Sequence, residues 1–328
     1  MDSRSSTRRG GSSEHLVEEY LQRVAAHDVV GARTFVLARL DSDDGLAALI
    51  AGLFVPAMAE VGDRWYGGRW SAAQEHVASG ITESALSAAS VRARSHRPAH
   101  DAPTAVLACP RGEEHVLPAR FVGELLVEAG ADVIALGLPV PDQDLAGFLA
   151  EVRPCALVVS CTEPLALPGV RAAVSAAHSV GVPALVGGAG LGPDDRRAAA
   201  LGADGWARRV DDAVHVLRTW REQTPELASA RPENAEVTAL LAHPARAGDV
   251  LGAESDRGRA VVGVVVRALT SALLSDDERL FTDRVTWIRG LFHARGTAPT
   301  VLDDALTAAD DVLRDQDVPQ ARRLLASA

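Results

Sequence analysis

The segment "TAVLACPRGEEHVLPARFVGELL" (residues 104–126) contains the change of pattern that decides the fold. An apolar run of strand length is followed by a short polar loop that carries Glu113 and His115, and a helical spacing of apolar residues begins near Pro118. Strand, loop and helix in this order form the repeating unit of a parallel sheet. Side chains in such a loop project from the carboxyl edge of the sheet, where ligands of these folds bind.

The same alternation continues for about a hundred residues. Short apolar runs alternate with amphipathic stretches through residues 102–221, and the expected strands lie in "TAVLACP", "DVIALG", "ALVVSC", "PALVGGA" and "GWARR". These five strand–helix units predict an α/β domain with a doubly wound, parallel, five-stranded sheet of the Rossmann or flavodoxin-like type. The loops after the first, third and fourth strands are therefore the places to look for a ligand.

Helical periodicity dominates on both sides of this domain. Residues 15–97 predict a four-helix bundle, in which "GLAALIAGLFVPAMAEVGDRW" is apolar all round, as in a buried helix, and Pro56 marks a kink. The Ser/Gly-rich residues 1–14 suggest a disordered tail. Residues 235–328 predict a separate all-α domain of several helices. Two breaker-rich linkers divide these parts, residues 95–103 and 221–236.

Composition excludes several classes of function. The chain has 328 residues, a net charge of −11 and no lysine, which argues against binding to a nucleic-acid backbone. Its three cysteines match no disulfide framework or zinc motif, so a reducing, cytoplasmic setting is expected. We find neither a signal peptide nor an apolar run of about 18 residues, so no membrane association is expected.

Three features fall at the predicted carboxyl edge of the sheet. Glu113 and His115 follow the first strand, Ser160 and Thr162 end the third, and a glycine pair, Gly187 and Gly188, ends the fourth. A histidine ligates a metal only when its imidazole is neutral, and an acceptor on the other ring nitrogen fixes the tautomer. Glu113 can be that acceptor. Taken alone, the first loop is equally compatible with a surface loop that holds a stray histidine.

In this order and at these separations, the three features resemble the cobalamin-binding domain of the methionine synthase, mutase and corrinoid-protein superfamily. The resemblance implies that His115 ligates cobalt from below, that Glu113 and Ser160 tune it, and that the glycine pair lines a slot for the nucleotide tail. "EEHVLP" departs from the family pattern at Pro118, where the family has glycine. This departure bears on the entry of the nucleotide tail and leaves His115 as the expected ligand.

The predicted bundle carries a second motif, Trp65 followed nine residues later by Glu75 and His76. In isolation this pattern is typical of bundle packing. Next to a cobalamin-binding domain it resembles CarH-type photoreceptors, which implies adenosylcobalamin as cofactor, Trp65 at the upper axial group, and Glu75 and His76 at the adenosyl moiety. The chain departs from that family at Tyr66, where the family has histidine, and it shows no DNA-binding domain before the bundle, so no direct DNA binding is expected.

The C-terminal helices concentrate aromatic residues in "LFTDRVTWIRGLFHARG" (residues 280–296). A helix core with one exposed histidine is one interpretation. The other is a pocket for a planar ligand, with walls from Phe281, Trp287 and Phe292 and with His293 as its polar contact. A cobalamin-binding domain followed by a helical, globin-like domain resembles the arrangement of the photocobilins. That resemblance implies noncovalent biliverdin as a second chromophore, with propionate partners among the arginines of this region, Arg284, Arg289 and Arg295.

Together these patterns predict a cytoplasmic cobalamin-dependent photoreceptor rather than an enzyme. Light-driven cleavage of a cobalt–carbon bond would trigger a conformational signal, passed on through a homo-oligomer or a downstream signalling protein. Two alternatives remain open at this stage. One is a corrinoid protein of a methyltransferase system, which needs an open upper face, and the other is a nonphotochemical cobalamin sensor or carrier.

Overall fold

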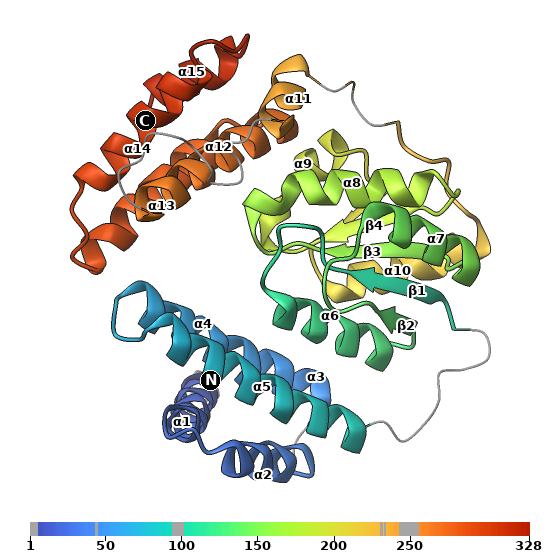
Figure 1. The fold of residues 1–328 in the computed structure, drawn as a ribbon. Coiled ribbons are helices and arrows are strands. Elements are labelled where there is room, and N and C mark those ends of the chain that lie inside the picture. The colour runs from blue at the N-terminus through green and yellow to red at the C-terminus, as the bar shows by residue number, and fades with distance from the viewer. Residues whose placement is uncertain (1–5, 43–44, 94–101, 230–231, 233, 243–255) are drawn as a thin grey trace. The chain divides into compact units, whose positions relative to one another are not determined.

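The computed structural model describes residues 6–42, 45–93, 102–229, 232, 234–242 and 256–328. The chain divides into two compact units, Met1–Ala99 and His100–Ala328 (Figure 1). The predicted sheet domain and the C-terminal helices thus belong to one unit, although the sequence suggests a separate helical domain.

The first unit is the predicted helical bundle. Its helices are α1 (Ser6–Ala25), α2 (Val29–Leu40), α3 (Leu46–Leu49), the π-helical turn η1 (Ile50–Phe54), α4 (Val55–Tyr66) and α5 (Ala72–Ala93). Tyr20 and Phe54 are fully buried at its centre, and the Tyr20 hydroxyl donates a hydrogen bond of 3.1 Å to Thr82 Oγ1. Helix α1 already begins at Ser6, inside the expected tail, because no proline interrupts the run into the amphipathic stripe.

Residues Leu46–Tyr66 form one continuous helical run of 21 residues, within which a window of 18 residues has a mean hydropathy of 1.6. By length and composition alone, this run could cross a membrane. Its apolar side chains Leu53, Phe54 and Val61 are buried within the bundle, which is the environment of a core helix. The π-helical turn ends immediately before the turn that holds Pro56, because proline lacks the N–H group that the regular ladder needs.

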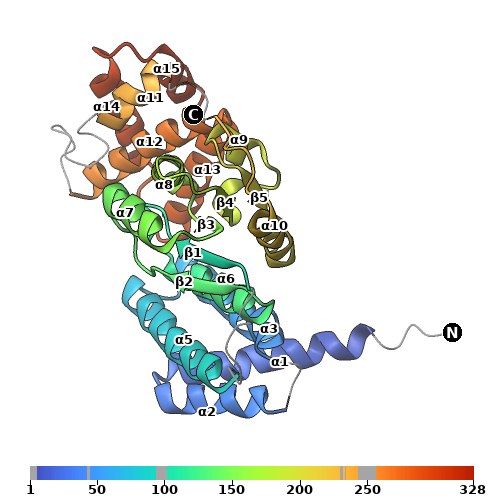
Figure 2. The same ribbon diagram turned by 90° about the vertical axis from the view of Figure 1, so that its right-hand side faces the viewer.

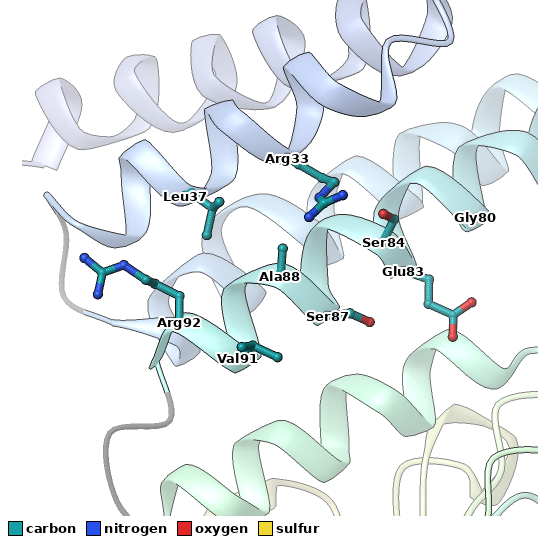
Figure 3. Close-up of a pocket in the computed structure, with 9 residues that line it drawn as sticks. All are labelled: Arg33, Leu37, Gly80, Glu83, Ser84, Ser87, Ala88, Val91 and Arg92. Atoms are coloured by element: carbon teal, nitrogen blue, oxygen red, sulfur yellow. The ribbon is translucent and has the colours of Figure 1, made fainter.

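The first unit also carries an open groove on α2 and α5 (Figure 3). Small side chains of α5, among them Ser84 and Ala88, form its floor, and Arg33 of α2 and Arg92 of α5 lie at its rim. None of the residues singled out in the bundle by the sequence analysis lines this groove.

The second unit contains the predicted parallel sheet, with strand order β2-β1-β3-β4-β5. The strands are β1 (Thr104–Ala108), β2 (Asp132–Ala135), β3 (Ala156–Ser160), β4 (Ala184–Gly187) and β5 (Gly205–Ala207). From β1 the chain goes first to β2 on one side and then to β3 on the other side, so the topological switch point lies between β1 and β3. In the register of the sheet, Ser160 lies beside Gly187 at the carboxyl edge. The fold class expected from the sequence is therefore confirmed.

Helices cover both faces of the sheet. Ala105 and Leu107 of β1 face a core shared with α6 (Val116–Glu128) and α10 (Val210–Glu222). Val106 and Ala108, which alternate with them, face α7 (Asp142–Val152) and α8 (Leu167–His178). Short segments complete this layer, namely the 3₁₀ turns η2 (Pro164–Ala166) and η3 (Ala189–Leu191) and the helix α9 (Arg196–Ala200).

The C-terminal part of the second unit is helical, as predicted. It comprises α11 (Ala235–Ala242), α12 (Asp256–Ser275), α13 (Arg279–Ala294), α14 (Thr300–Leu313) and α15 (Pro319–Ala326). Helix α12 is central, because it contacts α13 and α14 as well as α8, α9 and η2 (Figure 2). The buried carboxylate of Glu236 accepts hydrogen bonds from the backbone N–H groups of Gln320 and Ala321, and so caps α15.

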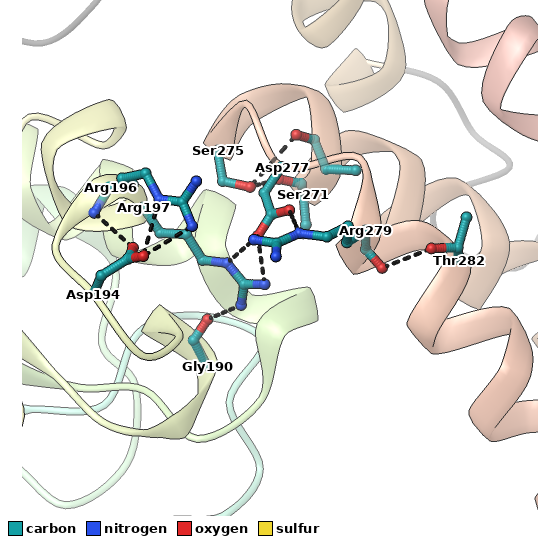
Figure 4. Close-up of polar contacts among 10 residues, drawn as sticks. Gly190, Asp194, Arg196, Arg197, Ser271, Ser275, Asp277, Arg279 and Thr282 are labelled. Atoms are coloured by element: carbon teal, nitrogen blue, oxygen red, sulfur yellow. Dashed lines mark hydrogen bonds and ion pairs between the residues drawn. The ribbon is translucent and has the colours of Figure 1, made fainter.

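An ion pair ties the C-terminal helices to the loop region after β4 (Figure 4). Arg197 of α9 lies 2.9 Å from the carboxylate of Asp277, between α12 and α13, and also donates a hydrogen bond to the carbonyl oxygen of Gly190. Both side chains are largely buried, with 13% and 15% of their surface exposed. The apolar core on this face of the sheet continues without a break into α12, α13 and α14.

Candidate functional site

The loop between β1 and α6 holds a buried glutamate against an exposed histidine. The Glu113 side chain has no exposed surface, whereas 57% of the His115 side chain is exposed. The Nδ1 atom of His115 lies 2.8 Å from Glu113 Oε1, and the backbone N–H of His115 donates to the same oxygen over 2.9 Å. The predicted pairing of these residues is therefore present in the structure.

The other carboxylate oxygen of Glu113 is held by the loop after β3. It accepts hydrogen bonds from the backbone N–H groups of Thr162, over 2.6 Å, and Glu163, over 2.8 Å. Burial alone would raise the pKa of Glu113. The hydrogen bonds from His115, Glu163 and Thr162 together outweigh burial and hold this pKa below its ordinary value. The carboxylate is therefore ionised at neutral pH.

An ionised Glu113 fixes the tautomer of His115. A carboxylate only accepts hydrogen bonds, so the ring nitrogen that faces it, Nδ1, must carry the proton. In neutral His115 the lone pair then lies on Nε2, the nitrogen that a metal ligand uses. The structure thus supplies one preorganised imidazole ligand.

This arrangement fits a metal that arrives inside a macrocycle. Over the described parts of the chain, no three His, Cys, Asp or Glu side chains gather into a group that could hold a bare metal ion. A corrin ring already provides four equatorial nitrogens to its cobalt, so a single axial protein ligand is sufficient. His115, oriented by a buried carboxylate, meets that requirement.

The loop after β3 supports Glu113 through backbone N–H groups rather than through side chains. Ser160 is buried at the end of the strand, and Thr162 reaches Glu113 through its backbone N–H rather than its hydroxyl. Glu163, which the sequence analysis missed, adds a second N–H and also places its carboxylate against Arg284. An acidic residue in a loop has the pattern of a solvated position, so only the neighbouring Ser-Cys-Thr motif could have drawn attention to it.

The glycine pair after β4 has a packing role in this structure. A Cβ atom on Gly188 would lie 2.2 Å from the carbonyl oxygen of Cys161, and the residue has a φ of 106° that favours glycine. A Cβ atom on Gly187 would lie 2.8 Å from the carbonyl oxygen of Ala207. The pair thus allows the backbone after β4 to pack closely against the backbone of Cys161 and Ala207. Its contact with a nucleotide tail stays a prediction.

A cavity of ≈ 420 Å³ opens beside His115. One side is formed by the loop that carries Glu114 and His115, and the other by α12 and α13. The α13 side includes Trp287 and Phe292, two of the predicted aromatic walls. Apolar side chains complete it, together with two arginines, Arg267 and Arg284.

The remaining aromatic and basic predictions in α13 have other surroundings. Phe281 is fully buried in the core and does not line the cavity, and His293 is exposed and also lies outside its lining. Arg284 pairs with Glu163 and lies 4.9 Å from the ring centre of Trp287. Arg289 lies 3.9 Å from Asp303, where both side chains are exposed. Phe281 and Phe292 lie on nearly the same face of α13 and differ in position along its axis: Phe281 packs in the first turn, and Phe292 lies in the last turn beside the cavity.

The motif of the helical bundle lies where α4 ends and α5 begins. Trp65 is half-buried in the last turn of α4, and Glu75 and His76 lie in the first turns of α5. His76 Nδ1 lies 2.7 Å from Glu75, whose other oxygen accepts a hydrogen bond from Ser79. The His76 side chain is 79% exposed, so it does not serve the bundle core.

Trp70, the second tryptophan of this corner, lies under Arg64 at 5.3 Å from the guanidinium carbon to the ring centre. This contact stacks two neighbouring side chains at the corner, and a role for Trp65 at a ligand stays a prediction.

Two segments match family models. Residues 16–89 match one B12 binding domain model, and residues 103–215 match another. The matches leave residues 216–328 uncovered. A comparison with curated proteins finds no match.

Solved structures with a similar fold include the monomethylamine corrinoid protein of Methanosarcina barkeri. It has 16% identity and a TM-score of 0.51, and the alignment covers 63% of this chain and 98% of that one. A novel cobalamin-binding protein from Desulfitobacterium hafniense DCB-2 has 22% identity and a TM-score of 0.33, with 62% and 98% covered. The methanol:cobalamin methyltransferase complex of M. barkeri has 16% identity and a TM-score of 0.35, with 65% and 82% covered.

Proposed function

We propose that this protein, whose residues 103–215 form a cobalamin-binding domain, is a cytoplasmic adenosylcobalamin photoreceptor and not an enzyme. The proposal assigns His115 to the lower face of cobalt, and Trp65, Glu75 and His76 to the upper axial group. The chemistry that the adenosyl form supplies is a weak cobalt–carbon bond, which visible light breaks. The protein's part is to hold the ligand histidine in one tautomer and to respond when the upper group leaves.

The observation that carries the proposal is the Trp65, Glu75 and His76 cluster. The His76 side chain is 79% exposed and pairs with Glu75, so this pair does not serve the bundle core and is open to a ligand. Here Glu75 is held between His76 and Ser79 at the surface, and Trp65 remains half-buried at the same corner. A preformed polar pair at the same α4–α5 corner as an aromatic side chain suits a nucleoside group, which offers hydroxyl groups and a flat base.

A second candidate is a corrinoid protein of a methyltransferase system. The similarity to the monomethylamine corrinoid protein favours it, because nearly that entire chain aligns with this one. That alignment covers only 63% of the present chain, however, and the C-terminal helices share a core with the sheet domain. A methyl carrier does not need an additional integrated segment, whereas a sensor needs an output element. This difference favours the photoreceptor.

The deciding experiment compares the protein before and after light. Full-length protein is loaded with adenosylcobalamin in the dark and then exposed to green light, and both samples are analysed by absorbance and size-exclusion chromatography. Protein loaded with hydroxocobalamin, under the same light, is the control. We expect a change in elution volume or assembly only in the adenosyl sample. Cofactor photolysis without any change in the protein would refute the sensor and leave the corrinoid carrier.

We also propose noncovalent biliverdin as a second chromophore in the C-terminal region. Support comes from Trp287, Phe292 and two arginines around the cavity, and residues 235–328 contain no cysteine for a thioether bond. Adding biliverdin to the protein should give a red-absorbing complex, and Trp287→Ala should weaken it. If wild-type protein gives no such complex, the second chromophore is rejected while the cobalamin proposal stands.

A further inference from the structure

One residue of the sheet domain has two separate tasks. Glu163 donates its backbone N–H to Glu113, and its side chain forms an ion pair with Arg284 of α13. Residues 163 and 284 are 121 positions apart in the chain. The cavity-side helix α13 is therefore linked through Glu163 to the carboxylate that orients His115.

Both partners of this ion pair are largely shielded from water. The Arg284 side chain is 13% exposed and that of Glu163 is 23% exposed. The guanidinium group also lies over Trp287, and Glu163 accepts a further hydrogen bond from the backbone N–H of Leu165. Shielded, charge-assisted contacts of this kind fix geometry more firmly than surface ion pairs do.

We propose that Arg284 is a positioning residue for the cobalt ligand, acting through Glu163 and Glu113 on His115. Without Arg284, the Glu163 side chain would turn toward solvent. The backbone N–H of Glu163 would then be less well aligned with the carboxylate of Glu113. Glu113 would then hold Nδ1 of His115 less well, and the ligand nitrogen would be less well aimed. The inference rests on cobalt ligation by His115 and does not depend on the response to light.

The proposal makes the C-terminal helices a regulator of the cobalamin site. Coupling between two sites is reciprocal, so a change at His115 must also alter the environment of Arg284. Any ligand in the neighbouring cavity, of which Arg284 is a lining residue, would act on the same link. A change in cobalt ligation at His115 would thus reach the C-terminal helices through Glu113, Glu163 and Arg284.

The structure supplies a matched control. The pair Arg197–Asp277 connects the same helices to the same edge of the sheet, is equally shielded and does not contact Glu113. Asp277→Asn should therefore loosen the attachment of the helices without disturbing the ligand. Glu163→Gln removes the charge but keeps the backbone N–H, and Arg284→Lys keeps the charge of its residue.

The first measurement needs no cofactor. Hydrogen exchange of the Thr162 and Glu163 amides is followed in the cobalamin-free, full-length protein. We expect exchange about 10-fold faster in Arg284→Gln and Glu163→Gln, partial rescue in Arg284→Lys and no change at these amides in Asp277→Asn. Equal acceleration in Asp277→Asn would mean that Arg284 only holds the helices in place, and would overturn the proposal.

The second measurement uses cobalamin in the dark. Hydroxocobalamin affinity should fall about 10-fold in Arg284→Gln, the lower end of the range for residues that support a ligand. After reduction to cob(II)alamin, the nitrogen splitting in the electron paramagnetic resonance spectrum should show a smaller His-ligated fraction. An unchanged fraction and affinity, in a variant whose circular dichroism shows that it is folded, would refute the inference even if the light response is intact.

Discussion

The protein contains two glutamate–histidine pairs with nearly the same separation and very different surroundings. Glu113 and His115 are 2.8 Å apart, and Glu75 and His76 are 2.7 Å apart. The Glu113 side chain has no exposed surface and receives three backbone N–H groups, whereas that of Glu75 is 27% exposed and receives one hydroxyl. The first pair is held by backbone groups from two loops, and the second only by side chains of one helix. Distance alone therefore does not tell a ligand from a contact residue.

The largest expected difference between the pairs is in cobalt ligation. His115→Ala should abolish the His-ligated spectrum of bound cobalamin and lower affinity by about 100-fold or more, because the ligand itself is lost. His76→Ala should leave the ligation spectrum of hydroxocobalamin unchanged. Absorbance titration of both variants measures this. A His-ligated spectrum that survives in His115→Ala would show that the ligand is another residue.

The next difference concerns stability. Glu113→Gln leaves buried N–H groups poorly paired and should lower the free energy of unfolding by about 1–3 kcal/mol. Glu75→Gln, at a partly exposed position, should change it by less than about 0.5 kcal/mol. Urea denaturation of the cobalamin-free proteins gives both values. Similar losses in the two variants would contradict the contrast in burial.

A smaller effect is expected in acid. Because the pKa of Glu113 is lowered on folding, its contribution is complete above the ordinary carboxyl pKa of 4.5 and is lost as the pH falls through the lower folded value. The stability gap between wild type and Glu113→Gln should therefore be constant near neutrality and narrow below about pH 4.5. Thermal melts across this range measure the gap. A gap that widens in acid would mean that the folded carboxyl pKa is raised.

The smallest effect separates the two tryptophans at the α4–α5 corner. Trp65→Phe should lower affinity for adenosylcobalamin relative to hydroxocobalamin by about 3- to 10-fold, the range expected for one aromatic contact. Trp70→Phe should leave that ratio unchanged, because Trp70 stacks on Arg64. Competition binding in the dark gives the ratios. If Trp70→Phe has the greater effect, the assignment by spacing is wrong.

The sequence predicts the sheet well because the information for it is local. Apolar runs and breakers mark every strand from β1 to β5, and the Glu113–His115 pair is visible because its members are two residues apart. The contact between Glu163 and Arg284 could not be found in this way, although Arg284 itself stands among the candidate arginines of the C-terminal region. Their contact spans 121 positions, and each residue alone has the pattern of a solvated surface. Helical periodicity predicts which face of a helix is buried, but it does not predict which loop packs against that face.

The C-terminal helices illustrate the same limit. Their existence follows from helical periodicity, but their union with the sheet in one core depends on the residues that α12 presents on two sides. Phe281 was placed with Trp287 and Phe292 because the three are close in sequence. The structure assigns Phe281 to the core and the other two to the cavity, because Phe281 lies in the first turn of α13 and the cavity lies against its later turns.

The cap that Glu236 provides for α15 has a consequence for the order of events during synthesis. The acceptor lies at the start of the C-terminal helices, and the N–H groups it satisfies are 84 and 85 positions later. While the ribosome adds those residues, this buried carboxylate has no capping partner. The helical segment therefore completes this hydrogen bonding only after residue 321 has been added, and a pause before residue 320 would leave it exposed to chaperones and proteases.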